Sequence, residues 1–208
     1  MTSVDASEPS DEALVLRSQA GCDDAFEILV TRFESRIYHF LRGLVRNNHD
    51  AEDLTQVSFV KAWRNIQTFR APGAFSAWLF LIAKRSALNH LRAHPLTETL
   101  PVDECRLEGA VDFDDPSGAL ARKDDSGALW TLARRLKPKQ YEALWLRYGE
   151  GFSIVETAKI METNQIRVKV LLHRGRHHLA KLLGRRAEQA ILPGRLSGNT
   201  STAPIGID

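Results

Sequence analysis

Apolar residues recur at spacings of three and four along most of the chain, which is the period of an α-helix. The segment from Asp23 to Arg46 is the clearest case, because its apolar positions form one wide stripe with arginine and glutamate opposite. These positions are Phe26, Leu29, Val30, Phe33, Ile37, Phe40, Leu41, Leu44 and Val45. No alternating strand pattern of useful length occurs, so the sequence predicts an all-α fold.

Two more helices are predicted in the same domain, which we place at residues 11–93. Asp50 can N-cap the first of them, with Glu52 and Asp53 in its first turn, where the helix dipole favours carboxylates. Pro72-Gly73 breaks the chain, and the second helix follows over residues 74–92. The positions predicted to be buried are Phe59, Ala62, Trp63 and Ile66 in the first helix, and Phe75, Trp78, Leu79 and Ile82 in the second. Stacking on bases is an alternative role for Phe75 and Trp78, but their helical spacing favours the core.

A change of composition separates this domain from the rest of the chain. Residues 94–125 are interrupted by Pro95, Pro101 and Pro116, and nine acidic residues there face only three basic ones. Such a segment cannot bury much apolar surface, so it predicts a flexible acidic linker, whose simplest role is that of a soluble tether. Residues 1–10 and the Gly, Ser, Thr and Pro-rich tail from 185 to 208 are expected to be disordered.

A second small helical domain is predicted over residues 126–184. Pro138 suits the first turn of a helix that stops at Gly149-Glu150-Gly151. Ser153 and Glu156 then form the S-x-x-E pattern of a capping box, which begins a short helix. A turn at Glu162–Asn164 leads into a long helix through Leu183, so the arrangement is typical of a helix-turn-helix.

The last helix carries the strongest charge signal in the chain. Between Gln165 and Arg186 there are seven basic residues and no acidic one. Solvated helix faces usually mix both signs, whereas phosphate binding needs basic residues to cluster. The N-terminal part of the second helix reads base edges in a helix-turn-helix. The candidate base readers are therefore Gln165, Arg167, Lys169 and Val170, and the candidate phosphate contacts are Arg174 and Arg176.

Several function classes are not indicated. Cys22 and Cys105 have no metal-type spacing, and His173, His177 and His178 lack a fourth ligand, so no metal is expected. Gly-rich phosphate loops, nucleophile elbows and HExxH motifs do not occur, so we expect neither an enzyme nor a cofactor. The first 13 residues have no apolar core and the longest apolar run, residues 77–83, is too short to span a bilayer. We therefore expect a cytoplasmic protein without membrane insertion.

Two motifs, in this order, resemble those of bacterial RNA polymerase sigma factors of the sigma-70 family, and in particular the extracytoplasmic-function (ECF) subfamily. The first, DAEDLTQVSFVKAWRNIQTF from Asp50 and the helix after it, resembles sigma region 2. The second, LKPKQYEALWLRYGEGFSIVETAKIMETNQIRVKVLLHRGR from Leu136, resembles sigma region 4. The resemblance covers residues 11–92 and 126–183 and implies that the acidic linker threads the basic channels of RNA polymerase.

The resemblance also implies site residues. Those that match the family's surface for the clamp helices of the largest catalytic subunit of core RNA polymerase are Asp50, Glu52, Asp53 and Gln56. Those that match its −10 elements, a base-capturing loop over 65–73 and a contact helix over 84–92, are Asn65, Gln67, Thr68, Arg70, Lys84, Arg85, Asn89 and Arg92. N-capping and solubility are the structural alternative for the acidic turn, and a simple connector is the alternative for the loop.

Four residues depart from the family pattern. Arg85 stands where many relatives have asparagine, Glu162 replaces the usual glycine of the turn, and Val170-Leu171 replaces small residues and an arginine. We expect a sigma factor that binds core polymerase and promoter DNA, directs initiation from −10 and −35 elements, and is controlled by an anti-sigma factor. A sigma-like decoy that sequesters an anti-sigma factor would not need the basic last helix. An ordinary one-domain regulator would leave the acidic turn unexplained.

Overall fold

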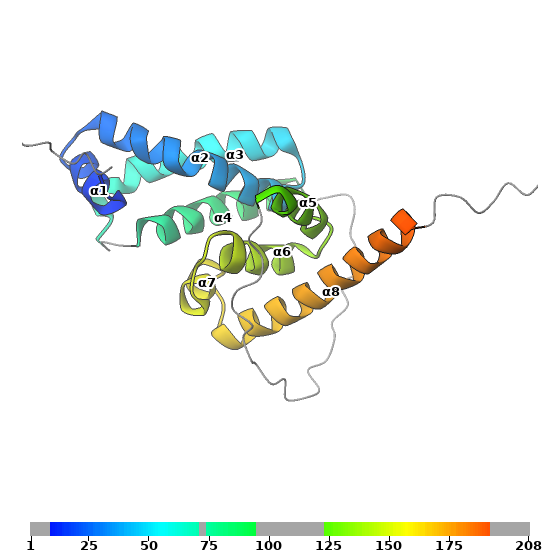
Figure 1. Ribbon diagram of the computed structural model, residues 1–208. Coiled ribbons are helices and arrows are strands. Elements are labelled where there is room, and N and C mark those ends of the chain that lie inside the picture. Colours follow the sequence, from blue (N-terminus) through cyan, green and yellow to red (C-terminus); the bar gives the residue numbers. More distant parts are fainter. Residues whose placement is uncertain (1–8, 71–73, 95–122, 192–208) are drawn as a thin grey trace, which may run out of the picture.

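The computed structural model describes residues 9–70, 74–94 and 123–191, and every regular element in these ranges is helical (Figure 1). The predicted all-α fold is thereby confirmed for the described part of the chain. Most of the predicted acidic linker, nearly all of the expected disordered N-terminus and most of the expected disordered tail lie outside the described residues.

The first domain is a bundle of α1 (Asp11–Gln19), α2 (Asp23–Val45), α3 (Asn48–Asn65) and α4 (Phe75–Ala93). A single 3₁₀ turn, Ile66–Thr68, follows α3 directly. The apolar stripe of α2 forms the centre of the bundle as predicted, and Phe33, Phe40 and Leu41 are almost fully buried. The helix ends where Arg46 adopts a left-handed conformation with φ 59°.

Two predictions for α3 are wrong. Its N-cap is Asn47, whose side chain accepts hydrogen bonds from the backbone N–H groups of His49 and Asp50, so Asp50 lies inside the first turn instead of capping it. The chain turns earlier than predicted because the left-handed end of α2 leads straight into Asn47. Trp63, predicted to be buried, is 37% exposed and lies with its ring 4.9 Å from that of Phe26.

The second domain contains α5 (Lys123–Ala133), α6 (Pro138–Leu144), a π turn (Trp145–Gly149), α7 (Ile154–Ile160) and α8 (Gln165–Ile191). The predicted capping box is present, since Ser153 and Glu156 each accept a hydrogen bond from the other's backbone N–H. The helix-turn-helix of α7 and α8 is confirmed. The last helix continues beyond the predicted end at Leu183, which places Arg185–Ile191 of the expected disordered tail in a helix.

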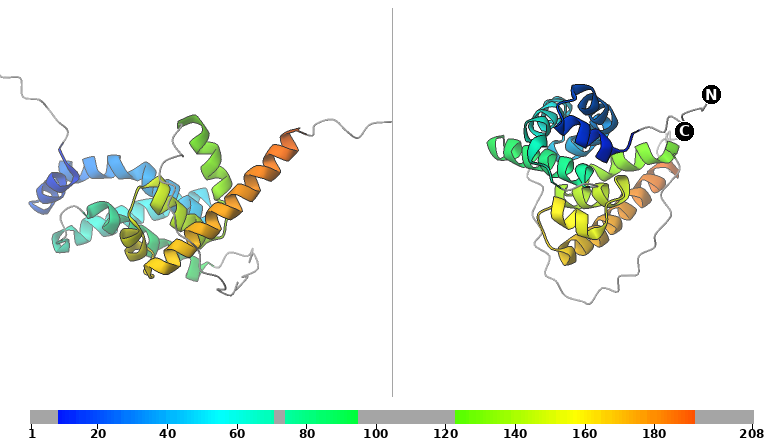
Figure 2. Two further views of the ribbon diagram at one scale, coloured as in Figure 1. Left: turned by 60° about the horizontal axis from the view of Figure 1, so that its bottom comes forward. Right: turned by 90° about the vertical axis from the view of Figure 1, so that its left-hand side faces the viewer.

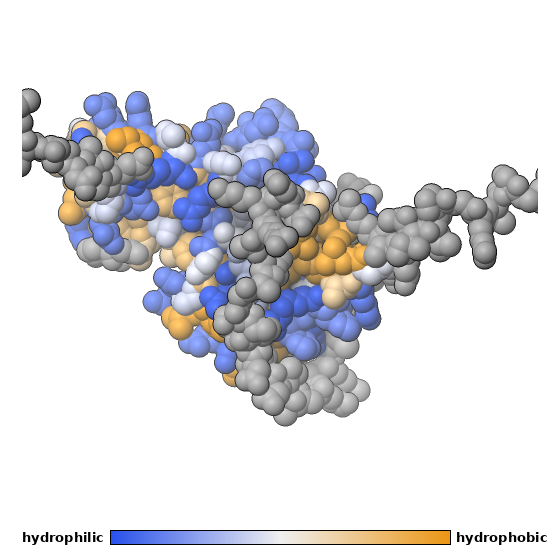
Figure 3. Space-filling model, viewed as in Figure 1, coloured by the Kyte–Doolittle hydropathy of each residue, from blue (hydrophilic) through white to orange (hydrophobic). Residues whose placement is uncertain are grey.

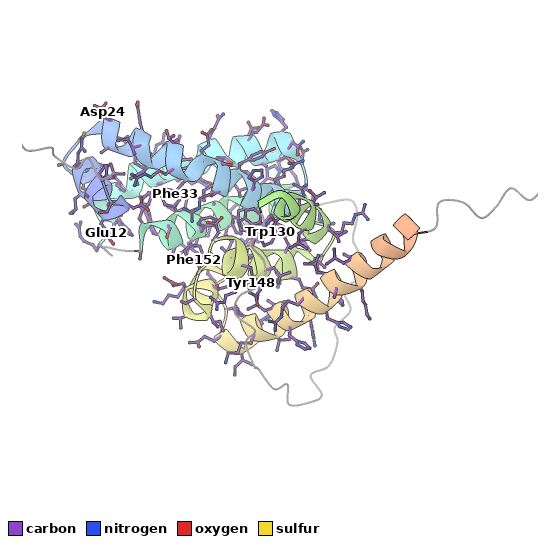
Figure 4. All side chains as sticks on the ribbon, in the orientation of Figure 1. Glu12, Asp24, Phe33, Trp130, Tyr148 and Phe152 are labelled. Atoms are coloured by element: carbon purple, nitrogen blue, oxygen red, sulfur yellow. The ribbon has the colours of Figure 1, made fainter. Side chains whose placement is uncertain are left out.

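The two domains pack against each other, with α2 and α4 on one side and α6 and α7 on the other (Figures 1 and 2). The Tyr141 hydroxyl donates a hydrogen bond of 2.9 Å to the backbone oxygen of His39. Its ring lies against Gly43, where an added Cβ would come within 1.9 Å of a ring carbon. Phe152, labelled in Figure 4, lies 5.4 Å from Phe80 of α4 between ring centroids. No sequence pattern predicted this contact.

Candidate polymerase and nucleic-acid interfaces

The acidic turn of α3 is mostly accessible. Glu52, Asp53 and Gln56 are exposed, as predicted for a polymerase-binding surface. Asp50 is half-buried, with its carboxylate 3.3 Å from the His90 ring of α4, so it also helps to hold these helices together.

Two apolar residues extend this acidic surface, and the sequence reasoning missed them. Val57 is 41% exposed and Val60 is 48% exposed. They follow Asp53 at helical spacings of four and seven, so all three lie on one side of α3. That spacing is visible in the sequence, but only exposure shows that the two valines leave the core. We name Glu52, Asp53, Gln56, Val57 and Val60 the α3 face.

The loop predicted to capture a base is described from Asn65 to Arg70, and residues 71–73 lie outside the described residues. Asn65, Gln67, Thr68 and Arg70 are all exposed, and each donates a side-chain hydrogen bond to a backbone oxygen. These bonds are 2.7–2.9 Å long, and those of Thr68 and Arg70 stay within the segment, whereas that of Asn65 returns to α3. The acceptor for Gln67 is the backbone oxygen of Gln19 in α1, a residue that the sequence reasoning did not consider.

The basic face predicted on α4 is split by the second domain. Asn89 and Arg92 are exposed. Lys84 is only 4% exposed, and its ammonium group donates to the Glu162 carboxylate at 3.1 Å. Arg85 donates two bonds to the same carboxylate, at 2.6 and 3.1 Å. The structure therefore brings Lys84 and Arg85 to one protein carboxylate. Lys84 is covered in this arrangement, whereas Arg85 stays exposed.

Two departures from the family pattern thus contact each other. Glu162 occupies the turn of the helix-turn-helix with φ 51°, the left-handed conformation in which glycine is usual. Hydrogen bonds from Arg85 and then from Lys84 hold its pKa below the ordinary value. Arg36 of α2 similarly donates a bond of 2.7 Å to Glu150 of the second domain. We name the Glu162 contact with Lys84 and Arg85 the interdomain latch.

Glu142 of α6 lies beside this latch in an unfavourable environment. Its side chain is buried, and its Oε1 atom has no hydrogen-bond partner. Burial raises its pKa to about 7, although the charges of Lys84 and Lys139 oppose that shift and Glu162 adds to it. The interface between the domains therefore contains a carboxyl group that is costly to ionise.

The recognition helix α8 begins at an accessible surface. Gln165 and Arg167 are exposed, whereas Lys169, Val170, Arg174 and Arg176 are half-buried. Arg176 donates to the Tyr148 hydroxyl at 3.2 Å, which fixes part of its side chain. Ile166 is 70% exposed beside the predicted readers, and sequence reasoning missed it because apolar residues are normally assigned to the core.

The surface of the second domain is not uniformly polar. Figure 3 shows hydrophobic colour where α5 approaches α8, and Trp130, Leu179 and Leu182 of these helices are only partly buried. Within the described ranges, no group of three or more His, Cys, Asp or Glu side chains could hold a metal ion. The helices of those ranges also include none that is long and apolar enough to cross a membrane.

Comparison with known proteins matches both domains to one family. Residues 29–95 match the family model of sigma-70 region 2, and residues 126–179 match that of sigma-70 region 4. A region 2 bundle followed by a region 4 helix-turn-helix defines a sigma factor. Sigma factors are transcription initiation factors and not enzymes. The chain belongs to the sigma-70 family of RNA polymerase sigma factors, in its ECF group.

Curated relatives cover most of the chain. It is 34% identical to the ECF RNA polymerase sigma factor BldN of Streptomyces coelicolor over 82% of this chain, but this match spans only 64% of BldN. It is 30% identical to the RNA polymerase sigma-H factor of Pseudomonas aeruginosa, over 85% of this chain and 95% of that protein. It is 32% identical to the ECF RNA polymerase sigma-E factor of Haemophilus influenzae, over 76% of this chain and 86% of that protein.

Two solved structures share the fold. The sigma factor RpoE from Bartonella quintana, in complex with the anti-sigma factor NepR, matches with a TM-score of 0.57 and 25% identity, over 76% of this chain and 96% of RpoE. CnrH, in complex with the cytosolic domain of CnrY, matches with a TM-score of 0.60 over 84% of this chain and 97% of CnrH. Its identity is 22%, so this second likeness concerns the fold alone.

Proposed function

We propose that this chain is a cytoplasmic ECF sigma factor that binds core RNA polymerase and directs initiation at promoters with its own −10 and −35 elements. One observation carries the proposal, namely that two oppositely charged surfaces lie on two domains of one chain. The α3 face is acidic, and the described N-terminal part of α8 is basic without an acidic residue. A subunit that docks on a basic protein while it holds DNA needs both surfaces.

The α3 face is the proposed site for the clamp helices of the polymerase. Its carboxylates would pair with basic side chains at the rim, and Val57 and Val60 would supply apolar contact between them. Asp50 contributes through α4, because its carboxylate already faces His90. This combination of apolar centre and charged rim is typical of specific protein interfaces.

DNA contacts are proposed on both domains. The loop from Asn65 and the α4 positions Lys84, Arg85, Asn89 and Arg92 would hold the unpaired −10 strand, since anchored polar groups beside basic side chains suit single-strand capture. Gln165, Arg167, Lys169 and Val170 would read the −35 element in the major groove, with Arg174 and Arg176 on phosphates.

Promoter binding requires the two domains to separate. Elements named −10 and −35 lie about 25 base pairs apart, or roughly 85 Å at 3.4 Å per base pair. Glu162 contacts Arg85 directly, and the proposed −35 readers begin three residues later at Gln165. Three residues span at most about 11 Å, so the closed form cannot contact both elements together. We propose that it is the resting form and that polymerase binding stabilises an open one.

Control by an anti-sigma factor is part of the proposal. RpoE, a sigma factor with the same fold, was solved with the anti-sigma factor NepR bound to it. A partner of that kind would act here by stabilising the closed form. The decoy alternative explains such a partner equally well, but it does not account for the basic start of α8.

Core binding tests the proposed function. Reversal of both Glu52 and Asp53 to lysine replaces attraction by repulsion at the α3 face, and it should weaken affinity for core polymerase by several kcal/mol if the contacts are desolvated, on the order measured for buried charge pairs. The matched control reverses the exposed Glu27 and Glu34 of α2, which makes the same change in net charge away from this face. Equal affinity of the two double variants, with both helical by circular dichroism, would refute the assignment.

A further inference from the structure

The loop proposed to capture a −10 base is tied to α1 by one side chain, Gln19. This residue is the last of α1, and the chain leaves the helix through Gly21 with φ 91°. Its Nε2 atom donates one hydrogen bond of 2.8 Å to the backbone oxygen of Ile66 and a second of 2.8 Å to that of Phe69. The two acceptors are the first residue of the 3₁₀ turn and the residue that follows it.

The contact is reciprocal. Gln67, between the two acceptors, donates its own amide to the backbone oxygen of Gln19 at 2.8 Å. The side chains of Ile66 and Phe69 are also buried in the core of the first domain, where they are 2% and 9% exposed. The exposed part of the loop is therefore held between buried side chains on one side and the Gln19 carboxamide on the other.

This geometry changes the interpretation of the loop. The Gln67 amide group has two hydrogens, and one of them is committed to the backbone oxygen of Gln19, so α1 fixes the direction in which this group can face a base. Thr68 is committed in the same way, because its hydroxyl donates to the backbone oxygen of Asn65 at 2.7 Å. The polar side chains therefore shape the loop, and α1 fixes the shape that they make.

We propose that Gln19 is a positioning residue for base selection at the −10 element. It sets the conformation of the loop over 65–70 from a helix that belongs to none of the surfaces predicted from sequence. The inference rests on the proposed function of this loop. A loop held in one conformation rejects a base that does not fit, whereas a loop released from its tether adapts to several bases.

The central experiment uses holoenzyme reconstituted from core RNA polymerase and full-length protein. Gln19→Met removes both donors at nearly constant volume, and Gln67→Met removes only the return bond. Leu16→Ala is the control on α1, because Leu16 is 63% exposed and has no contact with the loop among the described hydrogen bonds. The readout is open-complex formation on premelted promoters that carry each base in turn at every −10 position.

We expect Gln19→Met to lower the ratio between the best and the worst base at one position by about tenfold, as the loss of two hydrogen bonds allows. Gln67→Met should lower it by less, and Leu16→Ala should leave it unchanged. Core affinity should stay unchanged in both variants, and Tm should fall more in Gln19→Met, which loses two hydrogen bonds, than in Gln67→Met, which loses one. A side chain that only stabilised the fold would lower all affinities together and leave the ratio intact.

A loop replacement separates this inference from the function on which it rests. Replacing Gln67-Thr68 by Gly-Ser should abolish discrimination at the same position. If this replacement reduces discrimination but Gln19→Met does not, the positioning role of Gln19 is overturned and the proposed role of the loop stands. If the replacement itself discriminates like wild type, the loop is only a connector and both proposals fail.

Discussion

Glu162→Gln should make the free protein bind −10 DNA more tightly. The substitution removes the negative charge of the interdomain latch but keeps the size of the side chain and its left-handed backbone conformation. Lys84 and Arg85 then lose their charged partner in the closed form, while nothing changes in the open form that binds DNA. The variant therefore shifts the population toward the open form.

The magnitude follows from the exposure of the two cations. The Lys84 side chain is 5% exposed, so its bond to the carboxylate is of the kind that contributes about 1.5–3 kcal/mol. The Arg85 side chain is 60% exposed and the Glu162 side chain 42%, so solvent screening leaves their pair about 0–1 kcal/mol. A glutamine still accepts one bond, and we expect a net loss of about 2 kcal/mol, or roughly 30-fold in the ratio of closed to open protein.

Fluorescence anisotropy with a labelled −10 strand and the free protein measures this shift, because a fractionally populated competent state reduces apparent affinity by that fraction. Glu156→Gln is the matched control, since it makes the same charge change in the same domain and glutamine also completes a capping box. We expect Glu162→Gln to bind at least tenfold more tightly than Glu156→Gln. Equal affinities would refute the latch.

Three other predictions concern the domain interface and α8. Gly43→Ala should open the closed form, since its new methyl group overlaps the Tyr141 ring and overpacking costs about 1–3 kcal/mol. A radius of gyration from small-angle scattering equal to that of the control Gly184→Ala would contradict this. Burial raises the pKa of Glu142 from 4.5 to about 7, so the folded protein binds this proton more tightly than the unfolded chain does. The free energy of unfolding should therefore fall as pH rises from 4.5 through about 7. Glu142→Gln should accordingly raise the Tm at pH 8 but hardly at pH 4.5, and an equal effect at both values would disprove the assignment. Arg176→Ala should weaken binding to all DNA sequences equally and lower the slope of log affinity against log salt concentration by about one, whereas Arg167→Ala should change the preferred −35 sequence. The same uniform loss in both variants would mean that α8 is only an electrostatic clamp.

The helices were predictable because their signals are local. The stripe of α2 repeats every three or four residues, and the Ser153–Glu156 capping box spans four residues, so each element is encoded within its own segment. The misplaced N-cap shows the limit of such signals. Asn47 and Asp50 are both good caps, and the left-handed end of α2 decided between them.

The packing of the two domains was not predictable by the same means. Tyr141 and His39 lie 102 residues apart in the sequence, and Lys84 and Glu162 lie 78 apart. Arg85 and Glu162 were each noticed as departures from a family pattern, but neither position implies the other when only one sequence is read. Their contact follows from how the α4 and α7 surfaces fit together, which depends on the whole fold.

Accessibility was the second quantity missing from the sequence. A helical pattern identifies a face, but it does not say whether that face is covered by a neighbour. Lys84 was assigned to an open basic surface and is buried, whereas Val57 and Ile166 are exposed although apolar residues favour the core. The candidate site residues thus came from the sequence, and their availability to a partner came from the fold.

Run-off transcription with reconstituted holoenzyme tests the central claim most directly. Core RNA polymerase with this protein should initiate at defined sites on genomic fragments where core polymerase alone does not. The variant with Glu52 and Asp53 reversed to lysine should lose these transcripts, and the Glu27 and Glu34 control should retain them. A protein that binds core polymerase but yields no site-specific transcript, or transcripts unaffected by reversal of the α3 face, would contradict the account.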